Sequence, residues 1–193
     1  MPARKIQKAD IVRAALDILR TEDFSSVTAR RLAEMLECSV QPIYVNFANM
    51  DDLEREALNS MKVIYYEYMN AGAREPLAYK GMGLAYIRFA RDYPNYFKIL
   101  FMGQTGLSAD SFIEQDDAGN QIIRRGMEMT GFSYEQQKQV HLKVWIFTHG
   151  LATLVATGTV RFDDREIEHL LTESVRELVT GVKAAATTKE NHE

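Results

Sequence analysis

The sequence predicts an all-α protein, and two observations carry that prediction. Apolar residues recur at spacings of three and four along most of the chain, which is the period of an amphipathic helix, and no run alternates convincingly over the length of a strand. The glycines begin only at Gly72, and the four prolines lie far apart. We expect a three-helix N-terminal domain, which a long helix joins to a larger helical domain.

Three short helices are predicted within the first fifty residues. The first runs from about Lys8 to Glu22, with one apolar face. The second runs from about Ala29 to Leu36, with Thr28 as the residue that caps its free backbone N–H groups. Ser39 is a further capping candidate, and it would open a third helix that ends near Asn46.

Longer helices are predicted in the rest of the chain. Asp51 and Asp52 place negative charge at the start of a helix that runs to about Ala73, where the helix dipole favours it. A joint is expected at residues 72–76, and Pro94 is expected to end the next helix. The remaining helices are predicted over 79–92, 96–102, part of 110–129, 134–157 and 163–183, with a loop at 103–108. We expect the polar tail after Lys183 to fray.

Length and composition limit the class of protein. A chain of 193 residues with 46% hydrophobic and 26% charged residues is neither disordered nor collagen-like, and it forms one domain or two small ones. The single cysteine, Cys38, excludes an internal disulfide framework and most cysteine-based zinc sites. No apolar stretch approaches the roughly 18 residues of a membrane span, and no signal peptide is visible. We expect a cytoplasmic protein with no membrane partner.

The net charge of −4 argues against a nucleic-acid binder, but the acidic excess is unevenly distributed. Residues 1–50 hold seven Lys and Arg against six Asp and Glu, whereas the remaining residues hold sixteen against twenty-one. A small basic face is therefore compatible with the composition of the first fifty residues.

The second and third helices have the arrangement of a helix-turn-helix. The pair is Thr28–Leu36 and Ser39–Asn46, and the turn between them has about three residues, as that motif requires. In such a pair the second helix lies in the major groove of DNA, where each base pair presents a distinct pattern of donors and acceptors.

At these residues the sequence resembles the tetracycline-repressor (TetR) family of bacterial regulators. The resemblance covers about residues 5–65, which we take as a DNA-binding domain with its helix-turn-helix motif at about 28–47. Several capping, apolar and aromatic positions agree in order and spacing: Thr28-x-x-x-Leu32-Ala33, Cys38-Ser39-x-x-x-Ile43-Tyr44-x-x-Phe47 and Asp52-Leu53.

The resemblance implies DNA-binding roles for the matching residues. Thr28 would touch a phosphate, and the Tyr44 hydroxyl would bond the DNA backbone. Gln41 would pair with adenine, and the Pro42 ring would touch a thymine methyl group. Phe47 we expect in the core. Arg31 and a basic arm of Arg4, Lys5 and Lys8 could reach phosphates. The full set of expected DNA-binding residues is Thr28, Arg30, Ser39, Val40, Gln41, Pro42, Tyr44, Asn46 and Asn49.

Three departures from the family pattern weaken the expected contacts. Asn46 replaces the usual His, and Met50 replaces the usual Lys. Glu37 stands where the turn usually has Gly, and it would cost roughly 1 kcal/mol if the turn needs a left-handed backbone. We expect modest non-specific affinity with a shallow dependence on salt.

The region after Gly72 is rich in methionine and aromatic residues, which fit either an ordinary helical core or an apolar pocket. The stretch Trp145-x-x-x-His149-Gly150 resembles a TetR subgroup named for its Trp-His-Gly signature. The resemblance implies an effector-binding and dimerisation domain at about 75–184, with an unknown apolar or aromatic effector. The expected ligand-binding residues are Tyr86, Phe89, Phe97, Phe101, Met127, Trp145 and His149.

No constellation for catalysis or metal binding is found. His141 and His149 would lie about 12 Å apart along one helix, too far to share a metal. His149 is more simply explained as a structural histidine that bonds a neighbouring helix or lines the pocket. We therefore expect no enzyme, no metal and no cofactor.

The last two helices carry more apolar surface than one face needs, which predicts a homodimer formed through them. The sequence thus predicts a ligand-responsive transcription regulator, a repressor, which binds double-stranded DNA at a palindromic operator as a dimer. A helical small-molecule-binding protein or enzyme that does not bind DNA is the alternative, and the acidic balance favours it slightly. A regulator that answers a protein or no ligand also stays open.

Overall fold

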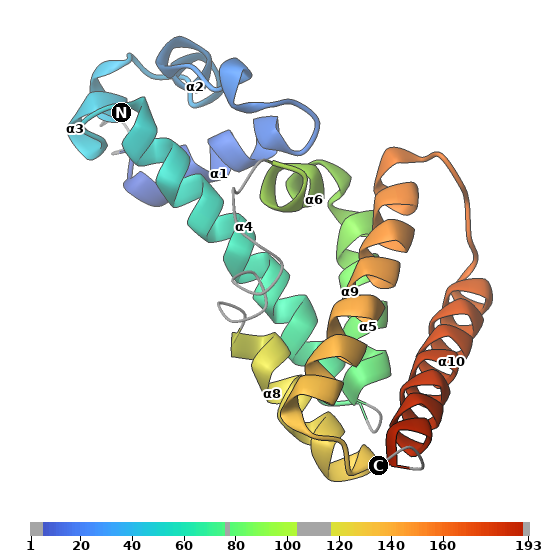
Figure 1. Ribbon diagram of the computed structural model, residues 1–193. Coiled ribbons are helices and arrows are strands. Elements are labelled where there is room, and N and C mark those ends of the chain that lie inside the picture. Colours follow the sequence, from blue (N-terminus) through green and yellow to red (C-terminus); the bar gives the residue numbers. More distant parts are fainter. Residues whose placement is uncertain (1–5, 76–77, 104–116, 191–193) are drawn as a thin grey trace. The chain divides into compact units, whose positions relative to one another are not determined.

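A computed structural model describes residues 6–75, 78–103 and 117–190, and within these ranges all regular elements are helices (Figure 1). The prediction of an all-α fold is confirmed. The elements in chain order are α1 (Lys8–Leu19), η1 (Phe24–Ser26), α2 (Ala29–Met35), α3 (Gln41–Asn46), α4 (Met50–Ala73), α5 (Ala78–Asp92), α6 (Pro94–Phe101), α8 (Asp117–Thr130), α9 (Tyr134–Thr157) and α10 (Asp164–Glu190).

Two predicted boundaries in the N-terminal region were wrong. Helix α1 ends at Leu19 and not at Glu22, because a one-turn 3₁₀ helix follows, capped by the Asp23 carboxylate, which accepts from the Ser25 N–H group at 3.0 Å. Ser39 does not cap α3. That helix starts at Gln41 with Val40 in the capping position and Pro42 in its first turn, where the missing N–H group of proline costs nothing.

Two further expectations need correction. Pro94 does not only end α5 but is the first residue of α6, again because the first turn of a helix tolerates proline. The backbone beyond Lys183 does not fray at once, and α10 continues to Glu190 through a run of alanines, the residues of highest helix propensity. Residues 110–116 of the helix predicted within 110–129, most of the predicted loop at 103–108, and Arg4 and Lys5 lie outside the described residues.

The chain divides into two compact units. The first consists of Met1–Glu67 and Asp92–Gly103, and the second of Tyr68–Arg91 and Gln104–Glu193. The division falls within α4 and at the junction of α5 with α6, so α6 belongs to the first unit although α5, which precedes it, belongs to the second.

The first unit packs α1, α2 and α3 around fully buried aliphatic side chains, including Ile11, Leu32 and Ile43. Helix α6 closes the C-terminal end of α1. Its Asn95 amide donates to the backbone carbonyls of Leu19 at 2.9 Å and Glu22 at 2.7 Å. These bonds satisfy carbonyl groups that a helix end leaves without an intrahelical partner.

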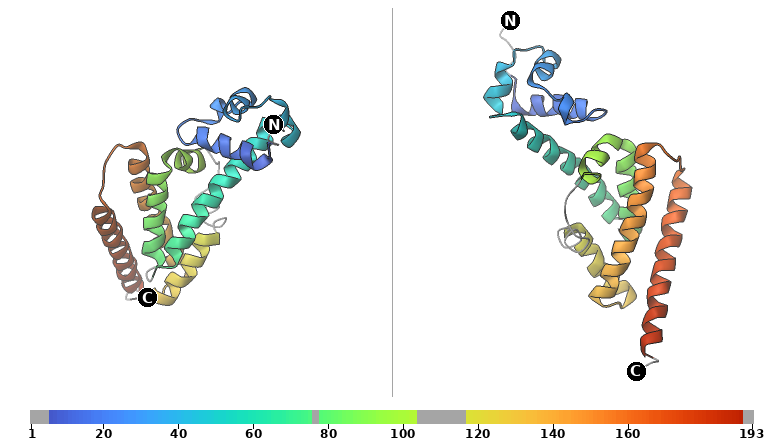
Figure 2. Two further views of the ribbon diagram at one scale, coloured as in Figure 1. Left: turned by 180° about the vertical axis from the view of Figure 1, so that it is seen from behind. Right: turned by 45° about the horizontal axis from the view of Figure 1, so that its top comes forward.

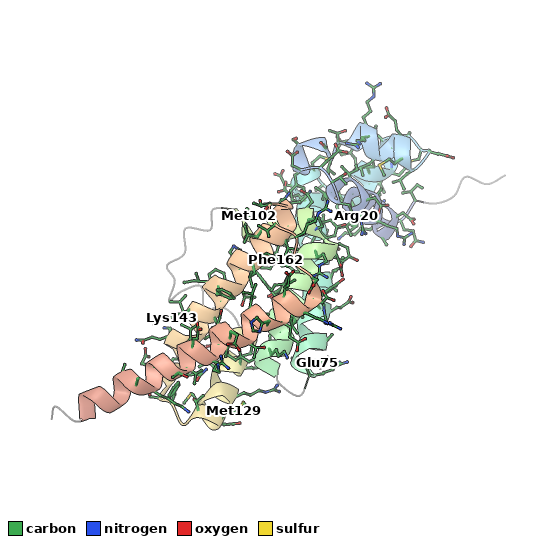
Figure 3. All side chains as sticks on the ribbon, turned by 90° about the vertical axis from the view of Figure 1, so that its right-hand side faces the viewer. Arg20, Glu75, Met102, Met129, Lys143 and Phe162 are labelled. Atoms are coloured by element: carbon green, nitrogen blue, oxygen red, sulfur yellow. The ribbon has the colours of Figure 1, made fainter. Side chains whose placement is uncertain are left out.

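The second unit is built on α9, which packs against both α8 and α10. The right-hand view of Figure 2 shows α10 beside α9, and Figure 3, seen from the α10 side, shows the two helices lying along each other. The core at this contact holds Phe132, Val140 and Val144, with Val175 and Leu178 of α10 packed against it.

Helices α4 and α5 approach closely at two glycines. A Cβ atom on Gly81 would lie 2.2 Å from the Gly72 carbonyl oxygen, and one on Gly72 would lie 2.5 Å from the Gly81 carbonyl oxygen. Because both obstacles are backbone atoms, only glycine permits this crossing at the present distance.

Candidate nucleic-acid interface

The helix-turn-helix is defined at its start by the Thr28 cap. The Thr28 side-chain Oγ1 atom accepts from the Arg31 N–H group at 3.2 Å, so the predicted cap of α2 is confirmed. The Thr28 backbone is extended (φ −116°, ψ 149°) and the residue is exposed. Thr28 therefore stands at an accessible corner of the first unit.

The turn between α2 and α3 contains the left-handed residue that the sequence suggested. Glu37 has φ 51°, and among the described residues it alone combines a positive φ with a side chain larger than glycine's. The Cys38 N–H group bonds the Ala33 carbonyl at 3.0 Å, which ends α2 in the manner of a Schellman motif. Glu37 therefore carries the predicted backbone penalty of roughly 1 kcal/mol, and its carboxylate is exposed just before α3.

Helix α3 buries one side and exposes the other. Ile43 and Phe47 are buried in the first unit, so the expectation that Phe47 belongs to the core is confirmed. Tyr44 is 55% exposed and is not a core residue. Gln41 and Ser39 are also exposed, whereas Pro42 is half-buried. The short helix thus holds a fixed orientation while it presents several side chains to solvent.

Two predicted DNA-binding residues have structural hydrogen bonds that the sequence analysis did not foresee. The Asn46 Nδ2 group donates to the Pro42 carbonyl at 2.7 Å, one turn back along α3. The Asn49 Oδ1 atom accepts from the Asp52 N–H group at 2.9 Å, which supplies a cap for α4. Each of these two amides therefore already makes one hydrogen bond within the protein.

The cationic side chains near α2 and α3 pair with carboxylates of the same unit. Arg31 forms a two-pronged pair with Glu22, at 2.6 and 2.8 Å, and this bond lowers the pKa of Glu22 to about 2. Arg30 pairs with Glu34 at 3.2 Å. Lys8 pairs with Glu56.

These pairs affect the charge that the first unit can offer to a phosphate. The Arg30 pair is largely exposed, and exposed pairs of this kind are worth little, so a phosphate can compete for the guanidinium group. Met50, in place of the family's lysine, is half-buried at the start of α4. The modest phosphate affinity expected from the sequence stays a prediction.

Among the predicted ligand-binding residues, the structure brings together Tyr86, Trp145 and His149. The Tyr86 hydroxyl lies 2.9 Å from His149 Nδ1, which joins α5 to α9. The Trp145 ring stacks on His149, with ring centres 5.1 Å apart and an interplanar angle of 20°. Burial lowers the pKa of His149. The interpretation of His149 as a histidine that bonds a neighbouring helix is confirmed.

The other predicted ligand-binding residues are placed differently. Phe89 is fully buried and meets Tyr68 edge-on at 5.7 Å. Met127 is half-buried on α8. Phe97 and Phe101 belong to the first unit, where their ring centres lie 5.5 Å apart. These residues take part in the packing of their own units.

Two features of the structure were not predicted from the sequence. Val45 is 76% exposed on α3, and its position one turn after Gln41 was the available signal. A second tyrosine–histidine pair joins α5 to α9, with 3.1 Å between the Tyr79 hydroxyl and His141 Nδ1. Nothing local predicts that pair, because 62 residues separate its members.

Within residues 6–75, 78–103 and 117–190, no group of three or more His, Cys, Asp and Glu side chains is placed to hold a metal ion. No helix in the same ranges has the length and apolar character needed to cross a lipid bilayer.

Comparisons with known proteins agree on one family. Residues 79–178 match the model of the tetracyclin repressor-like C-terminal domain. An uncharacterised HTH-type transcriptional regulator of Mycobacterium tuberculosis is 23% identical over 188 residues, which cover 95% of this chain and 84% of that protein.

Solved structures share the fold. A TetR-like transcriptional regulator from Rhodococcus sp. RHA1 has a TM-score of 0.66 at 13% identity, over 94% of this chain and all of that one. A TetR protein from Acinetobacter baumannii AYE, in complex with minocycline, has a TM-score of 0.54 at 18% identity, over 94% of this chain and 98% of that one.

Proposed function

This chain belongs to the tetracycline-repressor-like transcription regulators, and on that premise we propose that it is a ligand-responsive repressor that binds a palindromic operator as a homodimer. It is a DNA-binding regulator and not an enzyme. Its place of action would be the cytoplasm, where bacterial DNA is accessible.

The observation that carries the proposal is the solvent-facing side of α3. Ile43 and Phe47 anchor the helix, and the exposed Tyr44 stands on the other side. We assign DNA contacts to the residues that this helix and its flanks present: Thr28, Arg30, Ser39, Val40, Gln41, Pro42, Tyr44, Asn46 and Asn49. Residues 5–65 would form the DNA-binding domain.

Homodimerisation is supported by an exposed apolar surface on α9. Ile146 is 56% exposed, and nothing lies within 4 Å of the position that a Cβ atom would take on Gly150, one turn later. Among the large apolar side chains of α9, Ile146 is the most exposed, and we propose that it faces a partner. Two subunits would present two copies of α3 to the two halves of a palindrome.

Ligand response is supported by the chemistry of the second unit. Tyr86, Trp145 and His149 combine apolar surface with polar atoms, which suits an apolar or aromatic effector. A relative of the same fold is described in complex with minocycline. Helix α4 contributes residues to both units, and we propose that it transmits the response, with a coupling of roughly 1–3 kcal/mol.

The test is fluorescence-anisotropy binding to the DNA beside the protein's own gene. Tyr44→Ala should weaken specific binding more than tenfold, and the titration should reach two chains per duplex. Tyr66→Ala is the matched control, because Tyr66 is a similarly exposed tyrosine on α4. Equal binding by the Tyr44 and Tyr66 variants would contradict the contact assignment, and saturation at one chain per duplex would contradict the dimer.

A further inference from the structure

We infer that α3 recognises A·T base pairs through their thymine methyl groups, and that Val45 is the principal residue that sets this specificity. The inference rests on the proposed function and adds the chemical class of DNA sequence that the protein prefers.

The first argument is the chemistry that α3 lacks. Residues 39–49 contain no Lys, Arg, Asp or Glu. Guanine is most commonly recognised by Arg or Lys, and cytosine by a carboxylate that accepts from its amino group. The two arginines of α2, Arg30 and Arg31, pair with Glu34 and Glu22. The helix therefore has none of the side chains that usually select G·C pairs.

The second argument is what α3 exposes. Val45 is 76% exposed and Val40 is 43% exposed, although both side chains are entirely apolar. Of the three aliphatic residues Val40, Ile43 and Val45, only Ile43 is buried in the core. The two valines are exposed to solvent. In the major groove the apolar group that such side chains can contact is the C5 methyl group of thymine.

The third argument is the arrangement of the polar groups beside these valines. Gln41 and Val45 are four residues apart, so they share one face of the helix. A Gln amide pairs with the N6 and N7 atoms of adenine, and Val45 would contact the methyl group of a neighbouring thymine. The Asn46 amide already donates one N–H group to the Pro42 carbonyl, one turn back along α3. Amide and valine together favour A·T pairs.

The experiment starts with selection of bound duplexes from a random-sequence DNA library by the full-length protein. Each thymine of the enriched half-site is then replaced by uracil, which removes only the methyl group. At the position that Val45 contacts, we expect about a fourfold loss of affinity per methyl group, and about 16-fold when both half-sites are changed.

A double-mutant cycle identifies the contacting residue. Val45→Ala should weaken binding to thymine DNA and should remove the uracil penalty at one position per half-site while leaving it elsewhere. Val63→Ala is the matched control, because Val63 is a 57% exposed valine on α4, and its variant should keep the full penalty. Circular dichroism checks that each variant has the helical content of the parent.

The outcomes test the thymine-methyl inference and the proposed function separately. Sequence enrichment with tolerance of uracil at every position would overturn the inference and leave the regulator intact, as would half-sites whose contacted pairs are all G·C. If the Val45→Ala variant loses as much affinity as the parent when thymine is replaced by uracil, Val45 does not contact the methyl group. Absence of any enriched sequence would overturn the proposed function itself.

Discussion

Side chains on one side of α3 are exposed to solvent, whereas those at the contact between α5 and α9 are largely buried. On α3, Tyr44 and Val45 face solvent without serving the core. Between α5 and α9, tyrosine hydroxyls meet histidine nitrogens at 2.9 and 3.1 Å, largely away from solvent. Polar groups buried in this way are hydrogen-bonded within the protein, whereas exposed polar groups can bond water or a binding partner.

The difference separates two kinds of substitution. A change on the exposed side of α3 should alter DNA binding and leave stability within about 0.5 kcal/mol, as is usual for surface positions. A change at the helix contacts of the second unit should lower stability first. Four predictions test this separation.

The largest effect is expected where α4 and α5 cross. Gly81→Ala would place a methyl group 2.2 Å from the Gly72 carbonyl oxygen, so the helices must separate. We expect the free energy of unfolding to fall by about 3 kcal/mol or more, measured by urea denaturation. Gly181→Ala is the control, because nothing lies within 4 Å of a Cβ atom at that exposed helical position, and alanine should be neutral or stabilising there. Equal loss in both variants would disprove the close crossing.

The next effect concerns the bond between Tyr86 and His149. Tyr86→Phe removes the hydroxyl and keeps the ring, so the 2.9 Å bond to Nδ1 is lost from a half-buried imidazole. We expect a loss of roughly 1–3 kcal/mol in the free energy of unfolding. Tyr66→Phe makes the same chemical change at an exposed tyrosine and should have no measurable effect. Indistinguishable melting curves for the two variants would show that the Tyr86 bond contributes nothing.

A gain in stability is expected at the turn of the helix-turn-helix. Glu37→Gly relieves the left-handed backbone at φ 51° and should raise the free energy of unfolding by about 1 kcal/mol. Glu37→Gln keeps the strain and removes only the negative charge. Both variants should bind DNA more tightly at low salt, but only the glycine variant should melt at a higher temperature. A stabilised Gln variant would assign the effect to charge instead of backbone strain.

The smallest effect on stability is expected at the pair of Arg30 and Glu34. Glu34→Gln releases the guanidinium group and should change the free energy of unfolding by less than about 0.5 kcal/mol, because the pair is exposed. The logarithm of non-specific DNA affinity should fall more steeply with the logarithm of salt concentration, by about 0.9 per phosphate gained. An unchanged slope would show that Arg30 does not reach DNA.

Several parts of the candidate site could be predicted from the sequence because they depend on neighbouring residues. The Thr28 cap, the short helix after it and the left-handed Glu37 are consequences of a few adjacent residues and their spacing. The buried Phe47 follows from helical periodicity. Ser39 was wrong as a cap because α3 begins at Gln41, and Pro42 in the first turn favours this later start.

The sequence by itself determined the helical class, the order of the helices and the helix-turn-helix, since capping, periodicity and turn chemistry act over a few residues. Only the tertiary structure decided that Asn95 bonds the end of α1, and that Tyr79 and Tyr86 meet histidines more than sixty residues away. Such contacts depend on which surfaces meet after the chain has folded back on itself, and no local pattern of residues encodes that choice.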